Sequence, residues 1–188
     1  MAVITNSYAN VVSSFYSAKF QHNIEEMLVA PVPNYLIMIG YIGGGLARGL
    51  AVGVAVTIVA LFFTAIPLHN LWVAVSVLLL TSVLFSLAGL INAIYATSFD
   101  HISIIPTFVL TPLTYLGGVF YTVAMLPPLW QSVSLANPIL YMVNAFRYGL
   151  LGVSDVNLGV AYMAIVGFIA VLFGFALYLL NRGYGIRT

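Results

Sequence analysis

The sequence of 188 residues contains no cysteine and very little charge. Without thiol groups the chain forms no disulfide and binds no metal through thiolates. Charged residues make up 5% of the chain, against about 25% in a soluble domain, while 63% of the residues are hydrophobic. No basic cluster is present that could bind nucleic acid. These absences exclude an ordinary soluble domain and predict an all-α integral membrane protein that contacts the lipid bilayer.

Motifs for common catalytic chemistry are also absent. The sequence has no GxxxxGK[ST] phosphate loop, and Lys19 is its only lysine, so we expect no ATP site on this chain. It has no HExxH and no GxSxG motif. Its three histidines, His22, His69 and His101, lie far apart in the sequence and are expected on different sides of the membrane. The chain is therefore predicted to be no enzyme and to hold no metal or cofactor of its own.

Long uncharged runs predict where the chain crosses the membrane. No formal charge occurs between Arg48 and Asp100, and a single helix over that run would be about 75 Å long, against a hydrocarbon core of about 30 Å. The run must therefore turn, and the polar, proline-containing residues 67–70 are the place. The same reasoning predicts one membrane domain over residues 1–188. It contains five spans, at about residues 2–18, 39–64, 72–96, 103–124 and 157–181.

Basic residues orient these spans. Lys19, Arg182 and Arg187 lie at ends that this topology places on one side, which the positive-inside rule makes cytoplasmic. The turn at 65–71 and the region 125–156 are then outside. Residue 1 would begin within an apolar span on the outer side, so we expect one further span before it in the complete protein.

A short amphipathic segment follows the first predicted span. Ile24, Met27 and Leu28 recur at helical spacing, and prolines at positions 31 and 33 end the helix. Such a helix, at about residues 20–30 between two spans, can lie in the membrane interface or in a groove of a partner protein.

The same segment carries the densest group of ionisable side chains. His22, Glu25 and Glu26 share a helix face, and Lys19 precedes them. This spacing could hold a metal ion, but such a site needs three or four ligands and no others are near in the sequence. A solvated cytoplasmic loop and a docking surface are the remaining interpretations.

The predicted span at 103–124 is interrupted. Pro106 and Pro112 each remove a helix hydrogen bond, and Gly117 and Gly118 follow. Irregular backbone at membrane depth is tolerated where it is buried in protein or lines a cavity. A simple kink is the alternative, because proline and glycine are common in membrane helices.

Two short helices are predicted after this interruption, within residues 127–149. They are too short to cross the membrane twice, so we predict a re-entrant hairpin that enters from outside. Trp130 and Tyr141 would lie at its interface with the headgroups.

One arginine and three glycines stand out in the span at 39–64. Arg48 falls within the inner third of the bilayer, where it either contacts substrate or extends to the headgroups. Gly45, Gly49 and Gly53 recur every four residues and form either a close helix-packing stripe or part of a substrate path.

The interrupted span and the hairpin resemble the signature of the ABC-2 type exporter permeases. In this sequence the matching residues are Leu110, Leu113, Leu116, Gly117, Val119, Leu126, Pro127, Pro138, Ile139, Tyr141 and Arg147. The resemblance implies six spans in a complete member, with both termini in the cytoplasm. It also implies that segment 20–30 is a coupling helix lying in a cleft of a separate ATPase subunit.

The resemblance assigns roles to individual positions. Contacts with the ATPase are expected from Lys19, His22, Ile24, Glu25, Glu26, Met27 and Leu28. The outer gate is expected to comprise Gly117, Gly118, Phe120, Tyr121, Pro127, Trp130, Pro138, Tyr141 and Arg147, with Phe108 as a further candidate for the exit path.

The function implied is that of the permease subunit of an ATP-binding cassette exporter. It would move a substrate out across the bacterial inner membrane by alternating access. Two permeases, expected to be identical, would pair with two ATPases that bind ATP and Mg²⁺. The alternatives are an ion-coupled secondary transporter, which would require carboxylates at mid-membrane, and a membrane scaffold without transport activity. Asp100 and Asp155 fall at loop ends, which disfavours the former.

Overall fold

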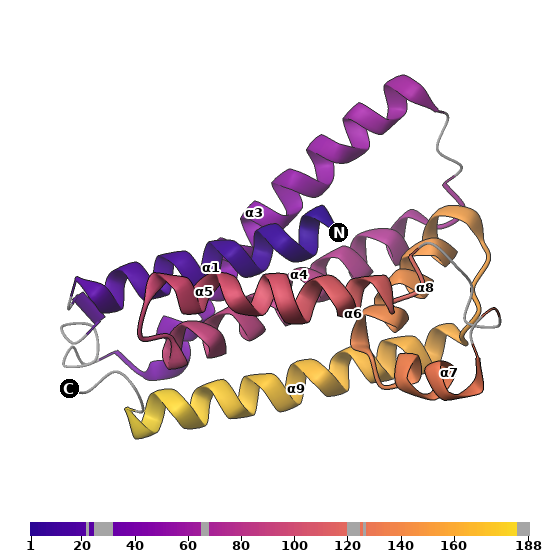
Figure 1. The fold of residues 1–188 in the computed structure, drawn as a ribbon. Helices are drawn as coiled ribbons and strands as arrows, with labels where there is room; N and C mark the ends of the chain where they lie inside the picture. Colours follow the sequence, from indigo (N-terminus) through magenta and orange to yellow (C-terminus); the bar gives the residue numbers. More distant parts are fainter. Residues whose placement is uncertain (22, 25–31, 65–67, 120–124, 126, 184–188) are drawn as a thin grey trace.

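The secondary-structure elements in the described part of the chain are all helices (Figure 1). The computed structural model describes residues 1–21, 23–24, 32–64, 68–119, 125 and 127–183. Among these, three helices are long and apolar enough to cross a membrane. They are α3 (Asn34–Phe63), α4 (Leu71–Tyr95) and α9 (Leu158–Arg182). The all-α prediction is confirmed, and these three helices match the spans predicted at 39–64, 72–96 and 157–181.

The prediction of five spans is not confirmed. The span expected at 2–18 is the helix α1 (Ala2–Phe20), but its repeated Ser and Asn residues leave it outside the group of long apolar helices. The structure therefore shows a helix at this position without showing that it crosses a membrane.

The segment expected to span at 103–124 is a helix in three pieces, which we call the broken helix. Its pieces are α5 (Phe99–Ile105), a π-helical turn η1 (Pro106–Leu110) and α6 (Thr111–Tyr115). Pro106 and Pro112 offer no N–H to the preceding turns, and the Thr111 hydroxyl donates to the Pro106 carbonyl at 3.0 Å. The described helix thus ends well before residue 124.

Polar caps fix the ends of the elements. The Asn70 side chain accepts a hydrogen bond from Val73 N at the start of α4, and Asn157 accepts one from Gly159 N at the start of α9. The helix α8 (Pro138–Leu151) starts with proline and ends at Gly152, whose φ is 72°. The short helix α7 (Pro128–Leu135) precedes it.

Helix α4 forms the centre of the bundle, packing against α1, α3, α8 and α9. It approaches α1 closely at Gly89, where an added Cβ would lie 2.7 Å from the Tyr8 carbonyl oxygen. One turn further along, the Asn92 amide donates to the Tyr8 hydroxyl at 2.7 Å, and both side chains are buried. Close backbone approach and a directional hydrogen bond therefore join α1 to α4.

Helix α3 meets the same pair through small residues. A side chain at Gly49 would collide with the hydroxyls of Ser7 and Ser82, and one at Gly45 would collide with Ser86. These three serines are fully buried, and their hydroxyls have no hydrogen-bond partner among the described residues. The contact of α3 with α1 and α4 at these glycines thus relies on close packing.

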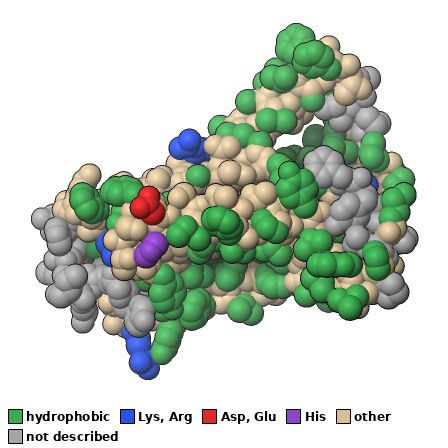
Figure 2. Space-filling view, viewed as in Figure 1, with side chains coloured by type: hydrophobic (Ala, Val, Ile, Leu, Met, Phe, Trp, Pro, Cys, Tyr) green, Lys and Arg blue, Asp and Glu red, His purple; other side chains and the backbone are tan. Residues whose placement is uncertain are grey.

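The second half of α3 leaves the bundle (Figure 1). Beyond Gly53 its side chains are exposed on nearly every side, and Phe62 and Phe63 are more than four-fifths exposed. Figure 2 shows hydrophobic side chains on this projecting part and in groups across the rest of the face in view. This surface is suited to contact with lipid or with another hydrophobic helix.

The bundle has two distinct ends, which we call inner and outer after the orientation predicted from the basic residues. At the inner end, Asn34 at the start of α3 donates to Asn181 near the end of α9 at 2.8 Å, and α1 also ends there. At the outer end, the backbone N–H groups of His69 and Asn70 donate to carbonyls of α8, at 3.1 and 2.8 Å. The predicted topology likewise places the turn at 65–71 and the hairpin region on one side of the membrane.

Gly89→Ala is expected to lower the free energy of unfolding by about 1–3 kcal/mol through overpacking. The better helix propensity of alanine offsets about 1 kcal/mol of this loss. The new methyl group would meet the Tyr8 backbone, which cannot rotate away as a side chain can. Thermal unfolding of the purified protein, followed by circular dichroism, measures the effect. Gly43→Ala is the matched control, since a Cβ at Gly43 has nothing within 4 Å. Equal melting temperatures for the two variants would contradict this packing.

Candidate functional site

The broken helix leads into a buried glycine turn at the outer end. Gly117 and Gly118 are both buried, and Gly118 has a φ of 71°, a conformation that favours glycine. A Cβ at Gly117 would lie 2.7 Å from the Ile139 side chain in the first turn of α8. The turn therefore lies directly on α8, and only a residue without a side chain allows this approach.

Side chains from α8 and its N-cap bind the carbonyls around this turn. The Asn137 amide donates to the Leu113 carbonyl at 2.5 Å, and Arg147 Nη2 donates to the Gly118 carbonyl at 2.7 Å. Carbonyls at the end of a helix lack intrahelical donors, and at membrane depth water is scarce. Asn137 and Arg147 thus satisfy polar groups that the interruption of the helix leaves unpaired.

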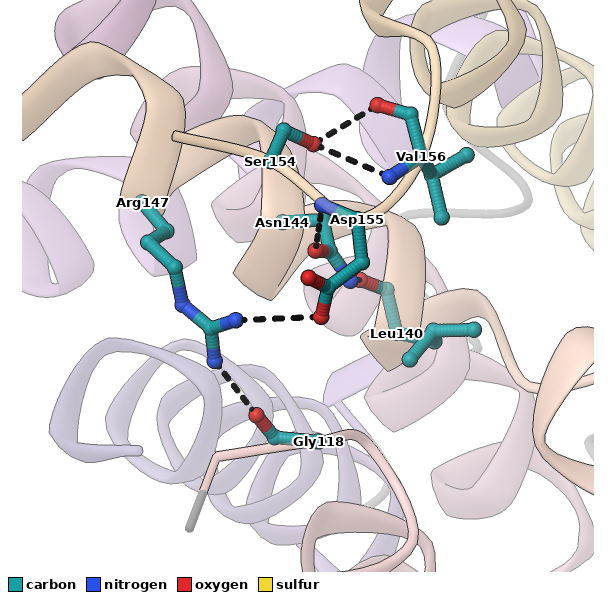
Figure 3. A network of polar contacts seen from close by, with 7 residues as sticks. All are labelled: Gly118, Leu140, Asn144, Arg147, Ser154, Asp155 and Val156. Atoms are coloured by element: carbon teal, nitrogen blue, oxygen red, sulfur yellow. Dashed lines mark hydrogen bonds and ion pairs between the residues drawn. The ribbon is translucent and has the colours of Figure 1, made fainter. Parts of the chain in front are cut away.

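Arg147 also pairs with an acid in the loop between α8 and α9. Its Nη1 lies 3.3 Å from Asp155 Oδ2, and the two side chains are 22% and 28% exposed. The Asp155 backbone N–H donates to the Asn144 side chain at 3.0 Å, and the Asn144 amide donates to the Leu140 carbonyl (Figure 3). We call Gly118, Asn144, Arg147 and Asp155 the outer network. It connects the glycine turn, α8 and the loop before α9.

The sequence pointed to only part of this arrangement. Arg147, Gly117 and Gly118 were singled out, and the structure brings Arg147 and Gly118 into contact. Asp155, treated only as a loop residue, and the asparagines of α8 and its N-cap were missed. Asn137 directly before Pro138 could have been found, since Asn before proline is typical of a helix N-cap.

A mostly apolar cavity of about 270 Å³ lies at the base of the projecting half of α3. Its lining comes from α1, α3, α4, α8 and the glycine turn, and includes Ile4, Gly53, Val77, Thr81, Val119 and Phe146. No ionisable side chain lines it. The cavity can therefore accept a hydrocarbon group, and the described side chains that line it offer no charge to recognise an ion.

At the inner end, Lys19 contacts its own chain. Its Nζ donates to the carbonyls of Ile94 and Ala96, both at 2.9 Å. Partial burial lowers the pKa of this ammonium group, because desolvation disfavours the charged form. Ile24 is 1% exposed and belongs to the hydrophobic core. For these two residues the structure shows internal contacts in place of a surface open to a partner.

The other predicted coupling residues, His22, Glu25, Glu26, Met27 and Leu28, lie outside the described residues. So do Phe120 and Tyr121 of the predicted gate.

The remaining residues predicted to act at the gate, in the path or in helix packing lie at both exposed and buried positions. Arg48 is exposed on α3, and Phe108 is 72% exposed on the π-helical turn. Trp130 is half exposed on α7, and the Tyr141 hydroxyl donates to the Leu135 carbonyl at 2.7 Å. Pro127 is exposed and Pro138 is half-buried. Gly45, Gly49 and Gly53 are buried along one face of α3.

Within the described ranges, no group of three or more His, Asp or Glu side chains lies close enough to hold a metal ion. His101 instead hydrogen-bonds Thr97 at 3.0 Å, and His69 packs edge-on against Tyr148.

The sequence matches the ABC-2 type transporter family over residues 1–151. The chain belongs to this family. The permease is 57% identical over 189 residues to "Inner membrane transport permease YadH" of Escherichia coli strain K12, a match covering all of this chain and 73% of the relative. It is 24% identical to "Nodulation protein J" of Rhizobium meliloti strain 1021 over 96% of this chain and 69% of the relative. No solved structure matches it.

Membership of this family makes the chain a transporter membrane subunit, and its three long apolar helices agree with a place in the bilayer. The signature that suggested the family contains Gly117, Ile139 and Arg147. Gly117 lies against Ile139, and Arg147 donates to the carbonyl of the neighbouring Gly118.

Proposed function

We propose that this chain is the permease subunit of an ATP-binding cassette exporter of the bacterial inner membrane. It moves a substrate outward by alternating access, driven by a separate ATPase. The observation that carries the proposal is the broken helix, with its end bound by α8, in a chain of the ABC-2 type family. The name of the similar E. coli protein, an inner membrane transport permease, supports the location.

The outer helices α7 and α8 cap the transport path in this proposal, as a re-entrant hairpin. The turn at Gly117 and Gly118 closes against α8, and Arg147 holds the two together. A path beside an interrupted helix is physically reasonable, since irregular backbone at membrane depth needs protein or a cavity around it. The chain contributes five spans, α1 and the broken helix included.

The ATPase docks at the inner end, on segment 20–30. Because Lys19 and Ile24 make internal contacts, we assign the docking contacts to His22, Glu25, Glu26, Met27 and Leu28. A chain without a phosphate loop requires such a partner to use ATP. Two copies of the permease and two ATPases form the transporter, and ATP with Mg²⁺ binds on the ATPases.

An ion-coupled secondary transporter is less consistent with the acids of this chain. Asp155 is engaged by Arg147 at the outer end. Asp100 lies exposed in the first turn of α5, at the inner end. Neither carboxylate lies midway along an apolar helix, where ion coupling would use it.

The proposal is tested by co-expressing the full permease with a phosphate-loop ATPase sought among the genes next to its own. We expect the two to co-purify, and the permease in lipid nanodiscs to raise the rate of ATP hydrolysis severalfold. An ATPase whose phosphate-loop lysine is replaced by alanine is the control and should show no hydrolysis. Separate elution of the two proteins, with no change in hydrolysis, would contradict the proposed function.

A further inference from the structure

The last turn of α1 holds the end of α4 through Lys19. The carbonyls of Ile94 and Ala96, which accept from Nζ at 2.9 Å, stand where α4 has run out of N–H donors. A cation at this position also interacts favourably with the negative end of the helix dipole. Two charge-assisted hydrogen bonds from one side chain therefore fix α1 to the last turn of α4.

The same turn of α1 holds the start of the broken helix through aromatic rings. Phe99, the first residue of α5, packs edge-on against Tyr16 with ring centroids 4.8 Å apart, and against Phe20 at 5.6 Å. Edge-to-face ring pairs at these distances are favourable beyond their buried area. Lys19 and these rings thus contact the chain on both sides of the corner between α4 and α5, which residues 96–98 form.

The helix on the other side of segment 20–30 is joined differently. Helix α3 contacts α1 and α4 through glycines that face the unpartnered hydroxyls of Ser7, Ser82 and Ser86. Helix α1, by contrast, is bound to α4 by Lys19 at its end and by the Tyr8–Asn92 hydrogen bond in its middle. A force on segment 20–30 therefore meets two kinds of attachment. Helix α1 is held by directional hydrogen bonds, and α3 by glycine packing and the Phe15–Tyr41 ring contact.

We propose that Lys19 is a positioning residue that fastens the start of segment 20–30 to the corner between α4 and α5. Movement imposed on that segment then reaches the broken helix through Lys19, Ala96 and Phe99, and continues to the glycine turn and the outer network. This inference rests on the proposed function, since it describes the route by which work from the ATPase reaches the gate.

The first test compares Lys19→Met with Lys19→Arg in the full permease bound to its ATPase. Lys19→Met keeps the length of the side chain and removes its donors, whereas arginine can still donate to both carbonyls. We expect Lys19→Met to co-purify with the ATPase but to lower the stimulated part of ATP hydrolysis about ten-fold, because both charge-assisted bonds are lost. Lys19→Arg should restore most of it. Stimulation that persists in Lys19→Met overturns the proposal.

A second test needs no ATPase. Phe20 and Phe99 are both more than half exposed, and the chain has no cysteine of its own. The double variant Phe20→Cys with Phe99→Cys can therefore be cross-linked in native membranes by a short bifunctional thiol reagent. We expect rapid cross-linking with Lys19 present, slower cross-linking with Lys19→Met, and recovery with Lys19→Arg. Equal rates in all three overturn the fastening role.

The two tests separate the inference from the function on which it rests. A wild-type permease that stimulates no ATPase contradicts the proposed function, while the cross-linking rates still decide whether Lys19 fastens the corner. Should Lys19→Met fail to accumulate, Lys19→Gln, whose shorter and uncharged side chain makes weaker hydrogen bonds, replaces it in both tests. For Lys19→Gln we expect stimulated ATP hydrolysis and a cross-linking rate between those of the wild type and those expected for Lys19→Met. Wild-type values of both would overturn the proposal.

Discussion

Replacing Arg147 with alanine is expected to lower the melting temperature of the permease by about 3–12 °C. The replacement leaves the Gly118 carbonyl and the Asp155 carboxylate without their partner. Losing hydrogen bonds made by a charged donor costs about 1.5–3 kcal/mol, and 1 kcal/mol corresponds to about 2–4 °C in a chain of this length. Thermal unfolding of the purified permease in detergent measures the fall in melting temperature.

Replacing Asp155 should lower the stability of the protein far less than replacing Arg147. The contact of Arg147 with the Gly118 carbonyl is 2.7 Å long, while that with Asp155 is 3.3 Å. Asp155→Asn keeps the backbone N–H that donates to Asn144 and loses only a partly exposed ion pair, worth about 0–1 kcal/mol. The melting temperature should then fall by at most about 4 °C.

A charge exchange separates the two contacts further. In the double variant Arg147→Asp with Asp155→Arg the ion pair can re-form, but position 147 has no donor for the Gly118 carbonyl. We expect no recovery of stability from this exchange, and partial recovery from Arg147→Lys, which still donates. Full recovery in the exchanged pair, or an equal cost of Asp155→Asn and Arg147→Ala, would show that the ion pair dominates and would contradict our interpretation.

Replacing Glu25 and Glu26 together with alanine is expected to reduce binding of the ATPase at least about ten-fold, the change that about 1.4 kcal/mol produces. Two adjacent carboxylates in a docking segment supply charge complementarity, and removing charges at the rim of an interface lowers the rate of association. The dissociation constant of the purified pair, measured at two salt concentrations, reports both affinity and the electrostatic share.

Asp100→Ala is the matched control for this pair. Asp100 is also a carboxylate at the inner end, exposed in the first turn of α5 and outside segment 20–30. Its removal should leave the affinity unchanged and affect only the helix dipole, by about 0.3–1 kcal/mol. An affinity that falls equally in both variants would assign the effect to general charge at this end.

The sequence was sufficient to predict the long helices because their signal is local. Uncharged runs and polar turns place α4 and α9 within a residue or so of the predicted spans. Proline chemistry likewise located the interruption of the broken helix, at Pro106 and Pro112.

The sequence was insufficient where a side chain binds a distant backbone carbonyl. The sequence predicts Lys19 as a contact with the ATPase, but its acceptors are the carbonyls of Ile94 and Ala96, and a carbonyl has no sequence signature. The contact of Arg147 with Gly118 is of the same kind. Ile24 fitted an amphipathic stripe by its spacing, yet tertiary packing buries it in the core.

The central claim is that segment 20–30 of this permease receives the ATPase. The most direct measurement places a photoreactive amino acid at Met27 of the full permease, co-expressed with the ATPase, and irradiates intact membranes. A photoreactive residue at Val59, which is 57% exposed on the outer half of α3, is the control. We predict a cross-linked permease–ATPase product from position 27 and none from position 59. No product from position 27, or equal yields from both positions, would contradict the claim.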